Sequence, residues 1–293
     1  MTVDIVSATL PETLVRPILD AAQSEDGVAA FSEAFERGLF DDTLNHTHLI
    51  AKTGDKTVAV AGIAEDGSTD LAVHPEHRRH GYGRALIQGV LERNADAGFW
   101  AHGDLPAAQA LARDLGMEPV RELLVMGTAL DPEVTPEVRD GYELVQYPEL
   151  VSRWGRGVVD KQWLEVNNDA FSWHPEQGGW DIAQLHRAMD TDWFDADGVW
   201  FLVAGDEIAG FHWTKRHPDG TGEIYVVGLS SKHRGEGMGG PLIQAGLNYL
   251  AECGSSQVIL YVEGDNEPAV KRYRQLGFDT RERHVVYKPA SKK

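Results

Sequence analysis

Cysteine is nearly absent from this sequence, and so is any long apolar run. The single cysteine, Cys253, excludes an internal disulfide and any zinc site built on cysteines. No apolar run reaches the roughly 18 residues of a membrane span, and the first residues, MTVDIVSATLPE, lack a charged-then-apolar leader. We therefore expect a soluble, cytoplasmic protein with no membrane partner.

Positive charge is also scarce. The 27 lysines and arginines stand against 46 aspartates and glutamates, which gives a formal net charge of −19. Such a surface repels the phosphates of nucleic acids and of anionic membranes, so neither is expected as a main partner. His174, His212 and His217 show no metal-ligand spacing, and we expect no metal site.

What the sequence does contain is one long repeat. The stretch LAVHPEHRRHGYGRALIQGVLERNA aligns with VGLSSKHRGEGMGGPLIQAGLNYLA, and GDLPAAQALARDLGM further on aligns with GDNEPAVKRYRQLGF. A repeat of this length indicates two copies of one domain. We predict an N-terminal domain over 1–135 and a C-terminal domain over 141–293. The stretch 131–141, with two prolines and many charges, is the predicted linker.

Hydrophobic periodicity gives both copies the same order of elements. In the first copy it predicts strands at 48–53, 58–64, 69–75, 99–103 and 122–130, and helices at 83–97 and 106–115. In the second it predicts strands at 201–205, 208–214, 223–229, 257–263 and 283–288, the last of which closes the copy, and helices at 241–252 and 268–276. A polar and aromatic loop is expected at 165–186, where it would bind a polyhydroxylated substrate or cap the core.

The recurring element is Arg-x-x-Gly-x-Gly, at 78–83 and 234–239, with a strand before it and a helix after it. The first amides of a helix lack internal partners and carry the positive end of the helix dipole. Glycines let these amides approach a phosphate closely, and the arginine would add charge. We interpret each copy of the element as a pyrophosphate cradle.

Three other interpretations compete with this one. A P-loop would end in Gly-Lys-Ser/Thr, which neither copy has. GEGMGG also matches the dinucleotide pattern, and Glu263 lies where a ribose-binding acid would. However, SSKHR separates this turn from its strand, the first copy lacks the third glycine, and only about 30 residues follow Glu263. A merely flexible turn is disfavoured because the element occurs twice in register.

The two stretches RRHGYG and RGEGMG resemble the pyrophosphate motif of the GNAT acetyltransferase superfamily, Arg/Gln-x-x-Gly-x-Gly/Ala. The resemblance covers both copies. It implies an α/β (α+β) fold of two tandem GNAT-type domains, each a mixed, mostly antiparallel central sheet flanked by helices. It also implies acetyl-CoA as the acyl donor. In that family a bulge splays the strand before the turn, and its amides hold the thioester and the pantetheine.

Only the second copy offers catalytic side chains. Acetylation of an amine needs a base, because an amine with a pKa near 8 is mostly charged at neutral pH, and an acid for the leaving thiolate. Glu223 opens the central strand, where alternation predicts one face for Glu223, Tyr225 and Val227. Tyr273 lies in the late helix, where the family often keeps its acid. At the matching positions the first copy has Gly67 and Ala112.

Longer runs sharpen the resemblance. VNNDAFSWHPEQGGW, GFHWTKRHPD, GEIYVVGL, LYVEGDN and FWAHG resemble a tandem-domain branch of the superfamily that acetylates the cysteinyl amine of cysteinyl-glucosaminyl-inositol, a small thiol-sugar. The resemblance implies substrate contact by Glu33, Glu176, Lys215, Glu223 and Tyr261. It implies coenzyme contact by Leu71, Ala72, Val73, Arg79, His80, Gly81, Tyr82, Gly83, Arg84, Val227, Gly228, Leu229, Arg234, Gly235, Glu236, Gly237, Met238, Gly239, Gly240, Asn266, Glu267, Pro268, Ala269, Val270 and Lys271.

Some features depart from that pattern, and two other functions stay open. Gly235 and Glu236 stand where an arginine is common, so weaker compensation of phosphate charge is expected, and the match around Glu33 is short. A GNAT enzyme for another amine, such as an aminoglycoside or a protein N-terminus, would suit the negative charge. A non-enzymatic acyl-CoA sensor would need neither Glu223 nor Tyr273. We expect a monomer.

Overall fold

The computed structural model describes residues 2–6, 9–130, 134–173 and 177–290. The chain divides into two compact units. Unit 1 comprises residues 1–124, 262–270 and 281–293, and unit 2 comprises residues 125–261 and 271–280. The predicted domain ranges 1–135 and 141–293 stay predictions, and 131–133 of the predicted linker lie outside the described residues.

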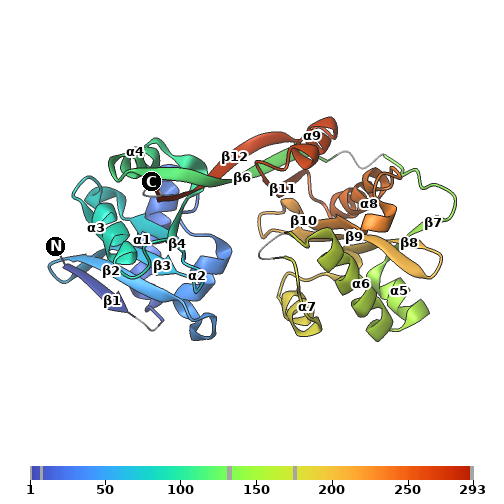
Figure 1. Ribbon diagram of the computed structural model, residues 1–293, viewed down its shortest axis with the longest axis horizontal. Coiled ribbons are helices and arrows are strands. Elements are labelled where there is room, and N and C mark those ends of the chain that lie inside the picture. Colours follow the sequence, from blue (N-terminus) through green and yellow to red (C-terminus); the bar gives the residue numbers. More distant parts are fainter. Residues whose placement is uncertain (1, 7–8, 131–133, 174–176, 291–293) are drawn as a thin grey trace. The chain divides into compact units, whose positions relative to one another are not determined.

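Unit 1 is a twisted sheet with helices on both faces (Figure 1). Its strands run in the order β1-β2-β3-β4-β5-β12, antiparallel except for the parallel pair β4–β5. The strands are β1 (Thr2–Val6), β2 (Thr47–Thr53), β3 (Lys56–Ile63), β4 (Ser68–Val73), β5 (Gly98–Ala101) and β12 (Asp279–Pro289). The helices are α1 (Glu12–Asp26), α2 (Glu33–Phe40), α3 (Tyr82–Leu91) and α4 (Pro106–Asp114).

Alternation along the strands builds a core on each face of this sheet. Leu49 and Ala59 pack with Leu86 of α3, whereas Ile50 and Val60 pack with the buried stripe of α1. Helix α3 ends earlier than the predicted 97, because the side chain of Asn94 accepts a hydrogen bond from the Asp96 N–H (3.1 Å) and forms a turn that competes with the helix.

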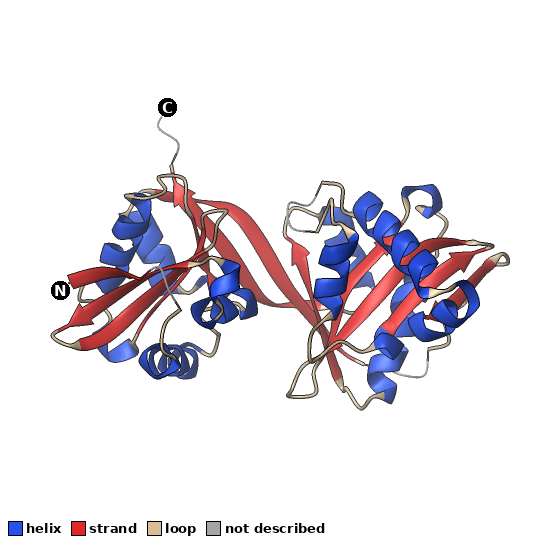
Figure 2. Ribbon diagram, turned by 90° about the horizontal axis from the view of Figure 1, so that it is seen from below, coloured by secondary structure: helices blue, strands red, loops and turns tan. Residues whose placement is uncertain are grey.

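Unit 2 repeats the arrangement, and Figure 2 shows its strands flanked by helices. Its strands run in the order β11-β10-β9-β8-β7, with β10 and β11 parallel and the other pairs antiparallel. They are β7 (Tyr142–Gln146), β8 (Val199–Ala204), β9 (Glu207–Arg216), β10 (Gly222–Leu229) and β11 (Gln257–Glu263). The helices are α5 (Tyr147–Trp154), α6 (Arg156–Ala170), α7 (Ile182–Met189) and α8 (Gly239–Glu252). Helix α9 (Glu267–Gln275) is divided, since residues 267–270 belong to unit 1 and 271–275 to unit 2.

Aromatic side chains fill the face of this sheet that α6 covers. The Trp163 ring lies 5.2 Å from that of Trp213 and 5.5 Å from that of Phe201, in edge-to-face arrangements. The predicted loop at 165–186 is wrong in part. Residues 165–170 belong to α6 and residues 182–186 belong to α7. Asn168 of α6 forms two hydrogen bonds with the backbone of Trp180, which lies between the two helices.

The strand expected to close the second copy is also placed differently. Residues 285–287 of β12 pair antiparallel with residues 99–101 of β5, inside unit 1. Strand β6 (Met117–Ala129) is divided as well, because its residues 117–124 belong to unit 1 and its residues 125–129 belong to unit 2. Local periodicity predicts that 283–288 is a strand, but its partner is set by pairing across 184 or more residues, which periodicity does not encode.

No helix within the described ranges is both long enough and apolar enough to cross a membrane.

Candidate functional site

A cavity of about 460 Å³ in unit 1 collects most of the coenzyme residues predicted for the first copy. It is lined by the glycine turn, by α3 and α4, and by the splayed ends of β4 and β5. The predicted residues among its lining are Leu71, Val73, Arg79, Gly81, Tyr82, Gly83 and Arg84. Ala72 instead packs against α1 on the opposite face, and the exposed His80 contacts the Arg78 carbonyl (2.7 Å).

The two glycine turns share one backbone conformation. Gly81 and Gly237 have φ of 88° and 82°, a region that L side chains rarely adopt. Arg79 and Gly235 match as well, with φ of 65° and 83°, so the glycine at 235 removes strain that Arg79 carries. A Cβ at Gly81 or Gly237 would meet nothing within 4 Å, so the space before each helix is open to a ligand.

The arginine that opens each motif holds its own loop, and its expected contact with phosphate stays a prediction. The Arg78 guanidinium forms two 2.7 Å bonds with the Asp26 carboxylate, and its Nε donates to the Val73 carbonyl. Arg234 likewise donates to the Leu229 carbonyl (3.2 Å). Because the charge of Arg78 is compensated by Asp26, we infer that these arginines fix the loops, and that backbone amides supply most of the attraction for phosphate.

A second cation lies beside the turn of unit 2, and the sequence analysis missed it. A Cβ at Gly240 would lie 2.5 Å from Nη2 of Arg272, so this guanidinium covers the start of α8. The residue of unit 1 that aligns with Arg272 is the uncharged Leu111, whose Cδ2 would lie 3.3 Å from a Cβ at Gly83, one position earlier at the start of α3. Arg272 therefore offers charge where Gly235 and Glu236 replace the arginine that is common in the family.

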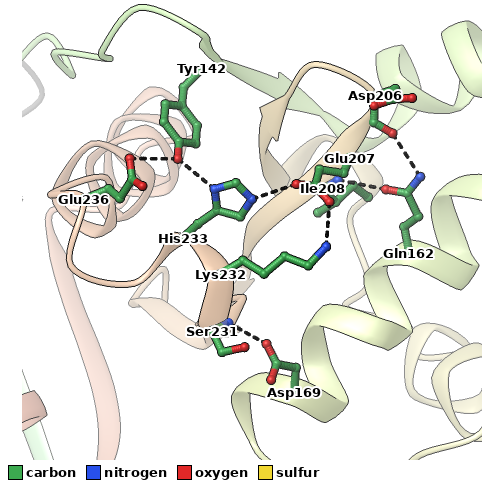
Figure 3. Close-up of polar contacts among 10 residues, drawn as sticks. All are labelled: Tyr142, Gln162, Asp169, Asp206, Glu207, Ile208, Ser231, Lys232, His233 and Glu236. Carbon is green, nitrogen blue, oxygen red and sulfur yellow. Dashed lines mark hydrogen bonds and ion pairs between the residues drawn. The ribbon is translucent and has the colours of Figure 1, made fainter.

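Hydrogen bonds to residues of α6, β9 and β7 hold the loop that carries the second turn (Figure 3). The Asp169 carboxylate accepts the Ser231 N–H, Lys232 bonds Glu207 (3.0 Å), and His233 bridges Glu207 (3.1 Å) and the Tyr142 hydroxyl (2.7 Å). These hydrogen bonds from Lys232 and His233 lower the pKa of Glu207 below its usual range. The loop is thus held in place before any coenzyme arrives.

The Glu236 side chain belongs to the same network. Its Oε2 accepts from the Tyr142 hydroxyl (3.2 Å) and lies 3.8 Å from the Arg139 guanidinium, which also donates to the Glu236 carbonyl (2.9 Å). The Arg139 guanidinium, just before β7, therefore partly compensates the negative charge of Glu236. Because this ion pair is exposed, it stabilises the fold only weakly.

The central strands of the two units differ at the position that matters for catalysis. In unit 1, β4 pairs with β3 without interruption, from Thr69 opposite Ile63 to Val73 opposite Ala59. In unit 2, β10 carries a bulge at Tyr225, where the register with β9 shifts between Ile224 and Val226. A bulge re-aims backbone groups and side chains, and bulges are over-represented next to active sites.

The bulge also corrects one prediction. Alternation placed Val227 on the same face as Glu223, but the extra residue turns Val227 to the other face, where it packs with Met238 and Leu242 of the α8 side. Tyr225 stays on the α6 face with Trp213. Gly228 is required by close packing, since a Cβ there would lie 2.9 Å from the Cβ of Ala170 at the end of α6.

Glu223 lies almost entirely buried on the α6 face, with 5% exposure. Lys215 is its antiparallel partner on β9, and the Lys215 ammonium lies 4.7 Å from the Trp193 ring centroid and 5.8 Å from that of Tyr225. Ile259 is its parallel partner, so the half-exposed Tyr261, two positions along β11, faces the same way. Three predicted substrate residues thus share one face of unit 2.

His217, for which the sequence analysis noted only the lack of metal-ligand spacing, is a hydrogen-bond partner of Glu223. Its Nε2 lies 2.7 Å from Glu223 Oε2. The exposed fraction is 27% for the His217 side chain and 7% for that of Glu223. The only signal in the sequence was the short spacing of the two residues around a turn.

Tyr273, the predicted acid, belongs to unit 2 and packs its ring against Phe278 at 5.8 Å. Desolvation raises its pKa to about 12. A phenol in this state is fully protonated at neutral pH and can donate to a thiolate whose conjugate thiol has a pKa near 8.5.

The remaining predicted residues divide as follows. Glu176 lies outside the described residues. Glu33 begins α2 in unit 1, after the cap in which Ser32 accepts the Phe35 N–H. Asn266 precedes α9, and its side chain accepts the Ala269 N–H (3.3 Å), so it acts as a helix cap. Glu263, the ribose-binding candidate, is held by a bidentate bond from Arg121 (2.7 Å).

Unit 1 has its own buried polar cluster, which the sequence analysis also missed. Asp70 is fully buried at the point where β4 leaves β5, and its Oδ2 accepts the Ser32 N–H (2.9 Å) and lies 3.1 Å from His102 Nε2. His102 lines the cavity and its Nδ1 lies 3.1 Å from His284 Nδ1. Burial and the neighbouring His102 lower the pKa of His284 to about 4. His102 Nδ1 is engaged by His284, whereas Nε2 lies near Asp70 Oδ2 without hydrogen-bond geometry.

One group of described side chains has metal-ligand spacing. The ligand atoms of His74, Glu76 and His77 lie within 4.8 Å of one another on the surface of unit 1. Exposed groups of this kind are common without an ion, and the prediction that no metal takes part is not tested by the geometry.

Comparisons with known proteins agree with this picture. The model of the acetyltransferase (GNAT) family matches residues 15–117 and 162–278, one match for each copy. A mycothiol acetyltransferase of Corynebacterium aurimucosum is 47% identical, over 97% of this chain and 98% of that protein. A mycothiol acetyltransferase of Corynebacterium efficiens is 47% identical, over 92% and 90%.

A solved structure shows the same fold. A GCN5-related N-acetyltransferase from Sphaerobacter thermophilus superposes with a TM-score of 0.72 at 22% identity, over 97% of this chain and 94% of that one. The predicted fold of two GNAT-type repeats, the acetyl-transferring activity and acetyl-CoA as donor are confirmed. The chain belongs to the GNAT acetyltransferase family and, within it, to the mycothiol acetyltransferases.

Proposed function

We propose that this enzyme transfers the acetyl group of acetyl-CoA to the cysteinyl amine of cysteinyl-glucosaminyl-inositol, giving mycothiol and CoA, and that the reaction takes place in unit 2. The observation that supports unit 2 as the place of the reaction is Glu223. It is buried on the bulged strand β10, on the face that also holds Lys215 and Tyr261. The corresponding strand of unit 1 has no bulge. With the extra residue of β10 counted, the counterpart of Glu223 is Ser68 and not the Gly67 of the sequence alignment, because Ser68 pairs with Gly98 as Glu223 pairs with Ile259.

The proposed reaction assigns a task to each group. Glu223 takes a proton from the acceptor ammonium, and the free amine attacks the acetyl carbon while backbone amides of β10 stabilise the oxyanion. The C–N bond forms, the C–S bond breaks, and Tyr273 protonates the CoA thiolate. The second proton, which the nitrogen loses as it becomes an amide, returns to the Tyr273 phenolate, so the net product of the cycle is one released proton. Residues 227–229, the turn at 234–240 and the helix start at 266–271 would bind the coenzyme, with Arg272 adding charge at the turn.

Unit 1 would bind a second acetyl-CoA without using it. Its cavity and its turn at 79–84 support coenzyme binding, whereas the positions that match the base and the acid hold Ser68 and Ala112. Monomeric behaviour and a cytoplasmic location remain proposals, which sedimentation of the purified protein and fractionation of the source cells would test.

The test is an assay of CoA release and of acetylated product with a panel of amines that includes the cysteinyl pseudodisaccharide, an aminoglycoside and a peptide N-terminus. We expect the pseudodisaccharide to give a kcat/KM far above the others. Glu223→Gln should lower kcat/KM by about 10²–10⁴ at pH 7 and recover in part at high pH, where the amine deprotonates itself. Glu165→Gln, an exposed glutamate on α6, is the control. Full activity of Glu223→Gln at pH 7 would remove Glu223 from the mechanism.

A further inference from the structure

The pair Glu223–His217 poses a question about where the proton of the acceptor goes. Glu223 is buried, and its carboxylate forms a 2.7 Å hydrogen bond with Nε2 of His217. His217 lies beyond the end of β9, at the hairpin turn where its N–H donates to the Thr221 carbonyl (2.9 Å). The turn places one edge of the imidazole on the carboxylate and leaves the rest of the ring partly in solvent.

Proton affinity makes this contact useful. An ordinary carboxylate is a weak base for an ammonium of pKa near 8, because the two differ by roughly 3.5 pKa units. An ordinary imidazole holds a proton about two pKa units more tightly than a carboxylate. A proton that moves on from the carboxylate to an imidazole is therefore easier to take from the amine, by a factor of up to about 10².

The charges around the pair suit such a transfer. Lys215 faces Glu223 across the β9–β10 register, and its ammonium is held over two aromatic rings. Asp219 lies in the same hairpin turn, where its carboxylate accepts the Thr221 N–H (2.9 Å). A cation thus lies beside the carboxylate of the pair, and an acidic side chain lies in the turn that carries the imidazole.

We propose that His217 is the second base of the acyl-transfer site, which receives through Glu223 the proton that the acceptor ammonium loses. The inference rests on the proposed function of Glu223. The proton passes from the ammonium to Glu223 and from Glu223 to Nε2 of His217, while the amine nitrogen bonds to the acetyl carbon. The thiolate takes its proton from Tyr273, and the Tyr273 phenolate regains a proton from the second one that the nitrogen loses as it becomes an amide. The His217 imidazolium then returns its proton to water. Because His217 acts through Glu223, it is a positioning and relay residue.

The test compares His217→Gln with the intact enzyme. Glutamine keeps an N–H donor for the carboxylate but cannot take up a proton. We expect kcat/KM for the acceptor to fall about 10- to 100-fold at pH 7, with KM for acetyl-CoA unchanged and with the deficit closing above the pKa of the amine. Added imidazole should restore part of the rate. His217→Asn serves as a second variant, and the thermal melting curves of both should match the parent.

A matched control is available in the same unit. His186 Nε2 lies 2.8 Å from the buried carboxylate of Asp160, a pair of the same kind away from β10. His186→Gln should leave kcat/KM unchanged, and imidazole should not affect it.

A double-variant cycle separates the possible outcomes. Glu223→Gln with His217→Gln should be no slower than Glu223→Gln alone, because His217 acts only through Glu223. Additive losses, or parental kinetics of His217→Gln and His217→Asn at pH 7, would overturn the inference while leaving Glu223 in place. A deficit of His217→Gln that persists at high pH would also overturn it, since loss of packing does not depend on acceptor protonation. Parental activity of Glu223→Gln would instead overturn the proposed function itself.

Discussion

The two glycine turns allow one substitution to be made twice in the same protein. Gly81→Val and Gly237→Val each put a side chain where the backbone has a φ above 80° and where open space lies before the helix amides. The strain should be alike, roughly 1–2 kcal/mol in each case. Differences between the variants therefore report on what each turn binds.

The expected loss follows from the contacts that the side chain blocks. A hydrogen bond to a charged group contributes roughly 1.5–3 kcal/mol, so blocking two amides of the turn costs about 3–6 kcal/mol of coenzyme binding. Since each 1.4 kcal/mol is a factor of ten, Gly237→Val should lower kcat/KM for acetyl-CoA by about 10²–10⁴. Gly81→Val should leave formation of the acetylated amine within a few-fold of the parent.

The effect of Gly81→Val should appear in the thermal stability of the protein with acetyl-CoA and not in its turnover. A ligand that binds only the folded state stabilises it by about 2.7 kcal/mol at 100 times its Kd. The rise in Tm that acetyl-CoA causes should therefore shrink in Gly81→Val, and turnover should survive at low temperature. Gly254→Val is the control, because Gly254 has φ of 90° and open space beyond α8 but lies away from both turns. A Gly81→Val variant that keeps the parental Tm response yet loses all turnover would refute our division of labour.

Two further predictions concern protonation. Tyr273→Phe should slow acetyl transfer, and the deficit should shrink with a donor whose thiol is more acidic; an equal deficit with both donors would point to packing against Phe278. His212 is fully buried on β9, and desolvation lowers its pKa to about 4 from an ordinary 6.5. Its neutral form therefore stabilises unit 2 fully above pH 6.5, and about 3 kcal/mol of this is lost as pH falls through 4. Urea unfolding followed by tryptophan fluorescence should show that loss, reduced in His212→Leu; a flat profile between pH 7 and 4 would contradict it.

Much of the fold follows from the sequence because its signals are local. Period-two apolar runs mark the strands, and the shared Arg-x-x-Gly-x-Gly marks the turn in both copies. The structure bears this out at Gly81 and Gly237, whose positive φ only glycine adopts without strain. The early end of α3 at Leu91 depends on one Asn94 side chain, a competition too fine for a periodicity argument.

The parts that the sequence did not predict depend on contacts between distant segments. Arg78 was expected to face phosphate, but Asp26, 52 residues away, takes both ends of its guanidinium. Residues 285–287 find their partner in β5 and not in their own copy. Neither choice can be derived from spacing along the chain, because several carboxylates and strand edges satisfy the same local pattern.

The bulge at Tyr225 supports the proposal that unit 2 carries the reaction while unit 1 keeps only a coenzyme cradle. Coenzyme binding needs a glycine turn and a helix start, which both units have with the same dihedral angles. Acyl transfer needs in addition a base and a redirected strand. In unit 2 the extra residue leaves Glu223 and Tyr225 on the α6 face while it turns Val227 toward α8. In unit 1 the regular register of β4 continues through Val73, so placing a glutamate at Ser68, the counterpart of Glu223, should not by itself create catalysis there.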